Sequence, residues 1–183
     1  LVIFDYPSAE EDGENYKHTT LKYTTLPLGV VLTHNHIITI CLNENYNIND
    51  MTNGTVKGVN TNQKTRFLLL LLRISQRFLI YLRQIDRLSS FTEKKLRKLM
   101  QNQEIIQMLG FEKSLVYFSS SLKNDEITLN KIMRGKIIKL YEEDEDLLED
   151  VLIEVRQATE MCNIYSNTLS STMDAYASII SNN

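Results

Sequence analysis

The sequence is poor in residues that interrupt or cross-link a chain: its 183 residues include two prolines, two cysteines and no tryptophan. Cys41 and Cys162 are far apart and neither has a Cys or His at ligand spacing, which argues against a disulfide framework and a structural zinc site. We therefore expect a reducing compartment. The longest apolar run, residues 67–72, is far shorter than the roughly 18 residues of a membrane-spanning helix. A composition with 43% hydrophobic residues predicts one globular domain.

The positions of prolines and charges divide the chain into three segments. Both prolines precede residue 30, so long helices are permitted afterwards. Residues 1–61 carry 3 basic and 7 acidic side chains, residues 62–139 carry 16 and 6, and residues 140–183 carry 1 and 10. The net charge of -3 thus hides a basic middle segment and an acidic final one, which should attract cations or basic partners.

The first segment, 1–61, has the composition of strands. Residues 1–6, 21–25, 29–32 and 36–42 are rich in apolar and β-branched side chains, and a Leu-Pro-Leu-Gly turn is expected between the second and third of these. This pattern predicts a partial antiparallel β meander. Residues 43–62 are dense in Asn, Gly and Thr and predict a surface loop. We expect residues 1–6 to be a strand that belongs to a longer chain, and not a natural N-terminus.

The remaining segments, 62–139 and 140–183, show helical periodicity. Apolar side chains recur every three or four residues to about residue 100, and again from Gln101-Asn102 to a stop at Gly135, which predicts a long antiparallel helix hairpin. A single stalk helix is expected from about residue 141 to the end, roughly 60 Å long. We expect it to project beyond the domain, to self-associate through its apolar stripe, and to be cut while still helical. Its heptad seam is Leu148, Val155, Cys162, Leu169 and Tyr176. The predicted fold class is α+β.

No catalytic motif is present in the sequence. A glycine-rich phosphate loop, a Gly-x-Ser-x-Gly motif and a Cys-His pair are all missing, so we do not expect an enzyme. His34 and His36 lie at an expected turn and form an incomplete metal pair, because a third ligand is lacking. The basic residues at 94–98 are expected to be a solvated helix face without nucleic-acid binding, because no aromatics interleave with them and the pI is about 5.7.

The strongest local signal is an acidic run, with seven carboxylates in residues 142–150. One interpretation is structural: acidic side chains favour the first turn of a helix because of its dipole. The other is functional: Glu143, Asp146 and Asp150, spaced three and four apart, form an acidic face that suits a hard cation. Glu149 and Asp150 lie beyond the first turn, and sequence physics alone leaves both interpretations open.

Several separated segments resemble the CorA family of magnesium transporters. Residues 147–154 (LLEDVLIE) and 173–183 (MDAYASIISNN) resemble the helix that precedes the first membrane span of that family. Residues 23–32 (YTTLPLGVVL) and 111–118 (FEKSLVYF) resemble its strand hairpin and second hairpin helix. The resemblance covers most of the chain in the right order.

This resemblance implies a cytoplasmic regulatory domain of a multi-pass cell-membrane transporter. Members resemble funnels of five subunits, each with a cytoplasmic α/β domain, a helix pair and a long helix that continues into the membrane. Hydrated Mg²⁺ between neighbouring cytoplasmic domains holds the pore closed. The implied partners are further copies of the chain, as a pentameric homo-oligomer, with no nucleic acid.

The family pattern can be carried to two residues. Asp150 matches the stalk aspartate of the intersubunit Mg²⁺ sensor, and Asp174 matches the acidic residue at the cytoplasmic mouth of the pore. Glu143 and Asp146 are candidates from helical geometry only. The family's Gly-Met-Asn signature and the acidic partner of the sensor are outside the chain, and the hairpin tip is basic where some members are acidic.

Alternative functions remain open at this stage. Relatives in the same superfamily transport zinc, so a zinc transporter is one alternative. Co²⁺ and Ni²⁺ are further alternatives to Mg²⁺ as the bound ion. The heptad seam also suits a coiled-coil scaffold or interaction module with no ion-linked role.

Overall fold

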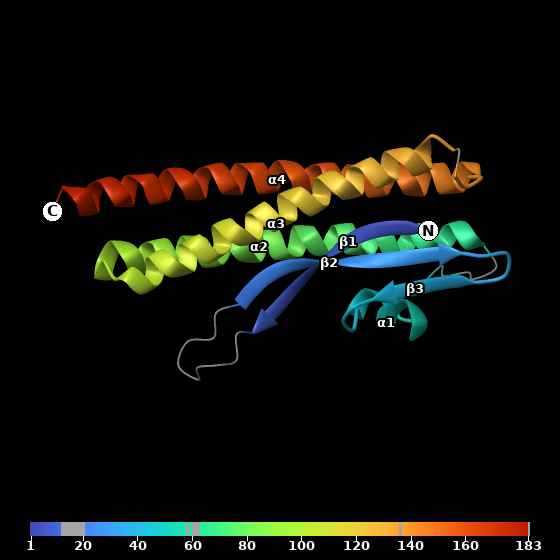
Figure 1. Cartoon of the computed structure of the whole chain (residues 1–183), viewed down its shortest axis with the longest axis horizontal. Coiled ribbons are helices and arrows are strands. Elements are labelled where there is room, and N and C mark those ends of the chain that lie inside the picture. Colours follow the sequence, from blue (N-terminus) through green and yellow to red (C-terminus); the bar gives the residue numbers. More distant parts are fainter. Residues whose placement is uncertain (12–20, 58, 60–62, 136, 183) are drawn as a thin grey trace.

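The computed structural model describes residues 1–11, 21–57, 59, 63–135 and 137–182. A three-stranded antiparallel sheet lies along a bundle of three long helices (Figure 1). The strands are β1 (Val2–Glu11), β2 (Leu21–Leu32) and β3 (Ile37–Cys41), and the helices are α2 (Phe67–Leu99), α3 (Asn102–Met133) and α4 (Glu142–Ser181). This confirms the predicted α+β class. None of the helices in the described ranges is both long and apolar enough to cross a membrane.

One face of the sheet packs on the helices and the other is open. Alternate residues of β1 point inward, so Val2, Phe4 and Tyr6 are buried, whereas Ile3 is exposed. The centre of the core is aromatic: the ring of Phe118 on α3 meets Phe78 on α2 edge-on at 5.2 Å and Tyr23 on β2 at 6.4 Å between centroids. Sheet, α2 and α3 therefore share one core.

β2 is a single strand that continues through Pro27, so the predicted Leu-Pro-Leu-Gly turn is wrong. Pro27 pairs with Asp5 of β1, whose backbone N–H points away from β2 to Asp125 on α3. Asp5 and Pro27 are therefore a pair that exchanges no backbone hydrogen bonds, and the missing N–H of Pro27 costs nothing on this side. Pairing with β3 begins only at Leu28, so the missing N–H of Pro27 costs no ladder bond on that side either.

The predicted loop at 43–62 contains a short helix, α1 (Tyr46–Thr52), and to that extent the prediction is wrong. The side chain of Asn45 caps this helix by accepting from the backbone N–H of Asn47 at 2.9 Å. Asp50 then joins α1 to α2 through an ion pair with Arg73, 2.8 Å long. Residues 58 and 60–62, which include the expected start of the following helix, lie outside the described residues.

The predicted helix hairpin is present, with a tight connection between α2 and α3. Met100 adopts a left-handed conformation, with φ of 49°, and its backbone N–H donates to the carbonyl of Leu96. This left-handed cap ends α2 and turns the chain within two residues into α3. At the other end, α3 stops before Gly135, which has φ of 69°.

α4 lies along the hairpin instead of projecting as a free rod, which corrects our expectation. In Figure 1 it runs beside α2 and α3 for most of its length, and its C-terminal end lies beside the hairpin tip. The five seam residues Leu148, Val155, Cys162, Leu169 and Tyr176 are all buried. Since the seam has partners within its own chain, it gives no reason for self-association and no support for a coiled-coil scaffold.

Candidate functional site

The first turn of α4 uses part of its negative charge for its own structure. The backbone N–H of Tyr141 donates to the Asp144 carboxylate at 3.0 Å, and the N–H of Asp144 donates back to the carbonyl of Tyr141 at 2.9 Å. Asp144 is buried despite its charge. The structural interpretation of the acidic run therefore holds for this residue, which stabilises the start of the helix.

Glu143 is tied to the neighbouring helix. Its carboxylate lies 3.2 Å from the guanidinium of Arg66, in the single 3-10 turn Lys64–Arg66 that leads into α2. Glu143 also lines an open cleft of about 850 Å³ together with Thr65, Lys139 and Tyr141. The side chain is 80% exposed, so the ion pair is a weak surface contact.

Asp146 and Asp150 lie one helical turn apart and are both exposed. The buried side chains on this part of α4 are Leu148, Val151 and Leu152, so the two aspartates lie on the side of the helix that faces away from the bundle. Their carboxylates therefore face outward from the chain. Within the described ranges, no three His, Cys, Asp or Glu side chains come close enough to hold a metal ion.

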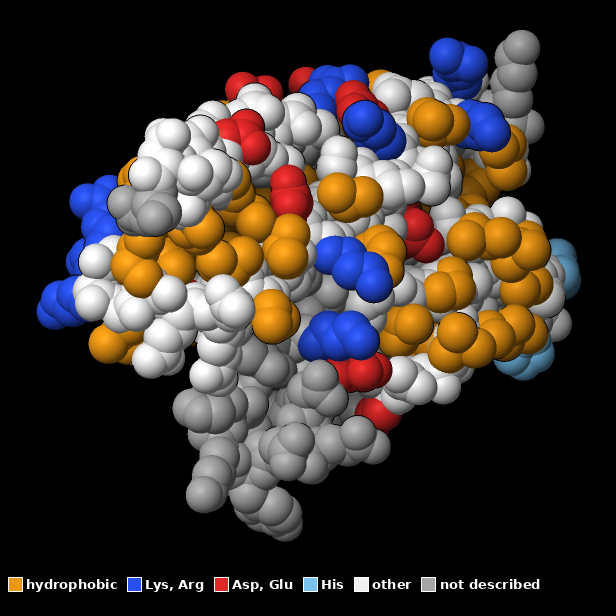
Figure 2. Space-filling view, turned by 60° about the vertical axis from the view of Figure 1, so that its left-hand side comes forward, with side chains coloured by type: hydrophobic (Ala, Val, Ile, Leu, Met, Phe, Trp, Pro, Cys, Tyr) orange, Lys and Arg blue, Asp and Glu red, His pale blue; other side chains and the backbone are white. Residues whose placement is uncertain are grey.

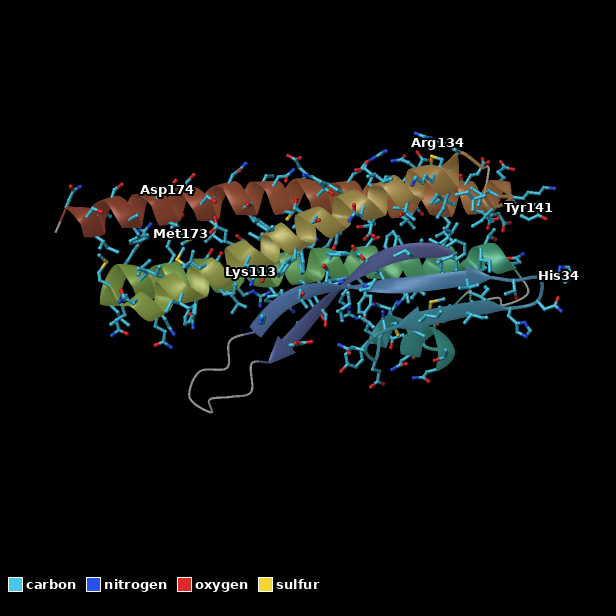
Figure 3. The ribbon with its side chains drawn as sticks, viewed as in Figure 1. His34, Lys113, Arg134, Tyr141, Met173 and Asp174 are labelled. Carbon is cyan, nitrogen blue, oxygen red and sulfur yellow. The ribbon has the colours of Figure 1, made fainter. Side chains whose placement is uncertain are left out.

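Asp174 lies near the opposite end of α4. It is exposed and stands 24 positions after Asp150, or about 36 Å along a helix. Figure 3 shows Asp174 and Tyr141 toward opposite ends of the helix. Asp150 and Asp174 therefore lie at well-separated positions along α4.

The histidine pair does not form a metal site with other described residues. His34 and His36 are exposed at the turn between β2 and β3, where the carbonyl of His36 accepts from the backbone N–H of Thr33 at 2.9 Å. Figure 3 shows His34 at the end of the sheet. No suitable third ligand accompanies them among the described side chains.

A stripe of polar side chains on α3, which the apolar periodicity of this helix does not predict, holds the helix to the sheet. Ser114 donates to the carbonyl of Tyr23, Ser121 to the hydroxyl of Thr25, and Thr128 to the carbonyl of Ile3. Asp125 accepts from the backbone N–H of Asp5 at 2.7 Å. The stripe therefore bonds two backbone groups on the free edge of β1, the N–H of Asp5 and the carbonyl of Ile3, and two groups of β2. Its sequence signal was available: positions 114, 121, 125 and 128 lie on one helical face.

Asp125 is the one strongly perturbed carboxyl among the described residues. It is 1% exposed, and its Oδ2 atom has no hydrogen-bond partner within the described part of the chain. Burial raises the pKa of this carboxyl well above its ordinary value, the N–H of Asp5 partly offsets the rise, and the Asp5 carboxylate adds to it. Its contacts are to the strand edge, so we assign it to structure instead of ion binding.

The family model and the similar solved structures point to the same family. A family model described as "CorA-like Mg2+ transporter protein" matches residues 1–183. The soluble domain of CorA from Methanocaldococcus jannaschii is 25% identical with a TM-score of 0.78, and the match covers 95% of this chain and 68% of that one. The complete CorA magnesium transporter of the same organism gives 20% identity, a TM-score of 0.81 and coverage of 98% and 56%. No protein of curated function matches the chain in sequence.

Proposed function

The chain belongs to the CorA-like Mg²⁺ transporter family, and we propose that it is the cytoplasmic regulatory domain of a Mg²⁺ channel, which senses Mg²⁺ between neighbouring copies and gates the pore. The family is one of transporters, not of enzymes. The chain spans 56% of the complete relative, so transport itself is a proposal about a longer protein. The observation that carries the proposal is the outward-facing pair Asp146 and Asp150 on α4.

An outward-facing pair of carboxylates suits a site that a second copy completes. Two carboxylates on one helix leave most positions around a cation open. Ile153 follows Asp150 on the exposed side of α4 and is 55% exposed, and Ile164 further along is 51% exposed. Apolar side chains beside carboxylates on an open helix face support a contact between copies. We infer a homo-oligomer, a pentamer if it follows the family.

The gating step follows from the charge of such a site. Mg²⁺ keeps several of its waters, so a site with few direct carboxylate ligands can hold it. When the cation leaves, facing carboxylates repel one another and favour the state in which the copies are apart. Closure would therefore depend on intracellular Mg²⁺. Asp174 would then lie at the cytoplasmic mouth of a pore formed where α4 continues into the cell membrane.

The decisive experiment uses the full-length protein and two matched variants. Asp150→Asn removes the charge of the proposed sensor and keeps its shape, and Glu149→Gln does the same to an exposed neighbour on the same helix. We expect Asp150→Asn to raise the Mg²⁺ concentration for half-maximal protection from protease by about tenfold, or about 1.4 kcal/mol per site. Glu149→Gln should shift it less than twofold.

Flux measurements complete the test. With Asp150→Asn, Mg²⁺ influx into vesicles should continue at internal Mg²⁺ concentrations that close the unaltered channel. Equal shifts for both variants, or none for either, would contradict sensing at Asp150. Influx of Zn²⁺, Co²⁺ and Ni²⁺ in the same vesicle assay decides between Mg²⁺ and these ions as the transported ion.

A further inference from the structure

The hairpin tip, where α2 turns into α3, is basic and apolar at once. We define the tip surface as Phe91, Lys94, Lys95, Lys98, Leu99 and Ile106, all of which are exposed. In Figure 2 this end of the molecule is turned toward the viewer, and hydrophobic side chains gather there with Lys and Arg side chains at the rim.

The three lysines of the tip surface are available to a partner. Within the described part of the chain, none of Lys94, Lys95 and Lys98 forms an ion pair. Arg97 lies between them but is engaged, because its guanidinium contacts Glu93 at 2.7 Å and the hydroxyl of Tyr176 at 3.1 Å. The free positive charge at this end therefore belongs to the lysines.

The apolar members of the tip surface stand between these charges. Phe91 is 56%, Leu99 54% and Ile106 67% exposed. The ammonium of Lys95 lies 4.6 Å from the centre of the Phe91 ring, so charge and apolar surface share one location. A surface that offers both suits the headgroup region of an anionic bilayer, where lysines meet phosphates and apolar side chains enter the acyl boundary.

The position of the tip supports the same partner. Arg97 binds Tyr176 of α4, and Leu96, Ile105 and Met108 of the hairpin face Met173, Tyr176 and Ile180 of α4 around a cavity of about 330 Å³. The tip is thus held beside the C-terminal end of α4 (Figure 1). Tyr176 lies within the last two turns of α4, which runs to Ser181.

We propose that the tip surface is a membrane contact that binds anionic lipid headgroups through Lys94, Lys95 and Lys98 and inserts Leu99 and Ile106 at the bilayer surface. The placement near a bilayer rests on the proposed function, since α4 must continue into the membrane from this end. The contact would hold the hairpin against the bilayer and limit how far α4 can tilt when the site at Asp150 empties.

The test is flotation of the chain with phosphatidylcholine vesicles that contain or lack phosphatidylglycerol. The unaltered chain should bind only the anionic vesicles, and added salt should weaken binding. Each lysine near such a surface contributes roughly fivefold, so Lys94→Gln, Lys95→Gln and Lys98→Gln together should lower the affinity on the order of a hundredfold. The matched control removes three charges at the other end of the hairpin, with Lys131→Gln, Arg134→Gln and Lys139→Gln, and should change it less than threefold.

A second variant separates insertion from charge alone. Leu99→Ser with Ile106→Ser keeps every charge and should lower vesicle binding by at least tenfold, because two apolar side chains no longer enter the bilayer. Inorganic phosphate should not compete at matched ionic strength, and a short RNA should not bind. Equal losses in the tip and control triples, binding to neutral vesicles alone, or displacement by phosphate or RNA would overturn the proposal. Mg²⁺ flux by the full-length protein is scored separately, so either proposal can fail alone.

Discussion

The two ends of the helix bundle differ in how their charges are used. At the acidic end, Asp144 accepts the N–H of Tyr141 and Glu143 pairs with Arg66. At the hairpin tip, Arg97 is the one basic residue of the 94–98 run that forms a hydrogen bond or ion pair among the described residues, and the three lysines are exposed. Some carboxylates at the acidic end are thus bound by groups of the chain itself, whereas the lysines at the hairpin tip are not.

This difference indicates which charged residues are available for function. A carboxylate that caps a helix or pairs with an arginine is explained by the stability of the chain. Asp146 and Asp150 at one end, and Lys94, Lys95 and Lys98 at the other, have no such explanation within the described residues. These are the groups to which we assign external partners, a cation at the first end and an anionic surface at the second.

The largest expected effect comes from breaking the core that joins the two ends. Phe118 is fully buried near the middle of α3 and contacts Phe78 and Tyr23 edge-on. Phe118→Ala should lower the free energy of unfolding by about 3–5 kcal/mol, because it removes a buried ring and leaves a cavity. Urea denaturation measures the loss, and Val116→Ala on the exposed side of α3 is the control, expected within about 0.5 kcal/mol.

Hydrogen exchange at both ends extends this experiment. Because one core connects them, amides at the start of α4 and at the hairpin tip should lose protection together. Loss of protection at one end only would show that the ends are separate units, and their charges could then not be compared as parts of one structure.

The next effect concerns the buried carboxyl on the acidic half of the bundle. Burial raises the pKa of Asp125, so the folded state holds this proton more tightly than the unfolded state does. Its stabilising contribution is therefore complete below the ordinary carboxyl pKa and is lost as the pH rises through the raised value. Asp125→Asn keeps an oxygen for the N–H of Asp5 and has no charge to bury.

We therefore expect Asp125→Asn to be more stable than the unaltered chain at pH 8, by about 1–3 kcal/mol, and similar to it at pH 4. Urea denaturation across this pH range measures the difference. Asp146→Asn, which changes an exposed carboxyl, should leave the pH profile unchanged within about 0.5 kcal/mol. Identical pH profiles for Asp125→Asn and the unaltered chain would show that Asp125 is ionised at no cost.

Sequence periodicity predicted the elements that depend on local pattern. The hairpin, the stop at Gly135 and the seam from Leu148 to Tyr176 are all present, because helical spacing of apolar residues is a strong signal. It failed where tertiary contacts decide. Pro27 continues a strand since its nitrogen lies beyond the end of β3, and the seam is covered by α2 and α3, whose relative positions no periodicity contains.

The candidate site shows the same limit. The sequence left open whether the acidic run serves the helix or a cation, and the structure separates its members by what each one touches: Asp144 and Glu143 have partners, whereas Asp146 and Asp150 face outward. The polar face of α3 that includes Asp125 is visible in the sequence, but the partner of Asp125 is not, because it is the backbone of a strand 120 positions away.

The smallest expected effect compares the two ends directly. Asp144→Ala should cost about 1 kcal/mol of stability, because α4 loses a cap and a negative charge at the positive end of its dipole. Lys98→Ala should cost only about 0.3 kcal/mol, from its place in the last turn of α2. Thermal unfolding of both variants measures the difference. If Lys98→Ala cost as much as Asp144→Ala, the tip lysines would be as structural as the capping aspartate, and their surplus charge would no longer point to a partner outside the chain.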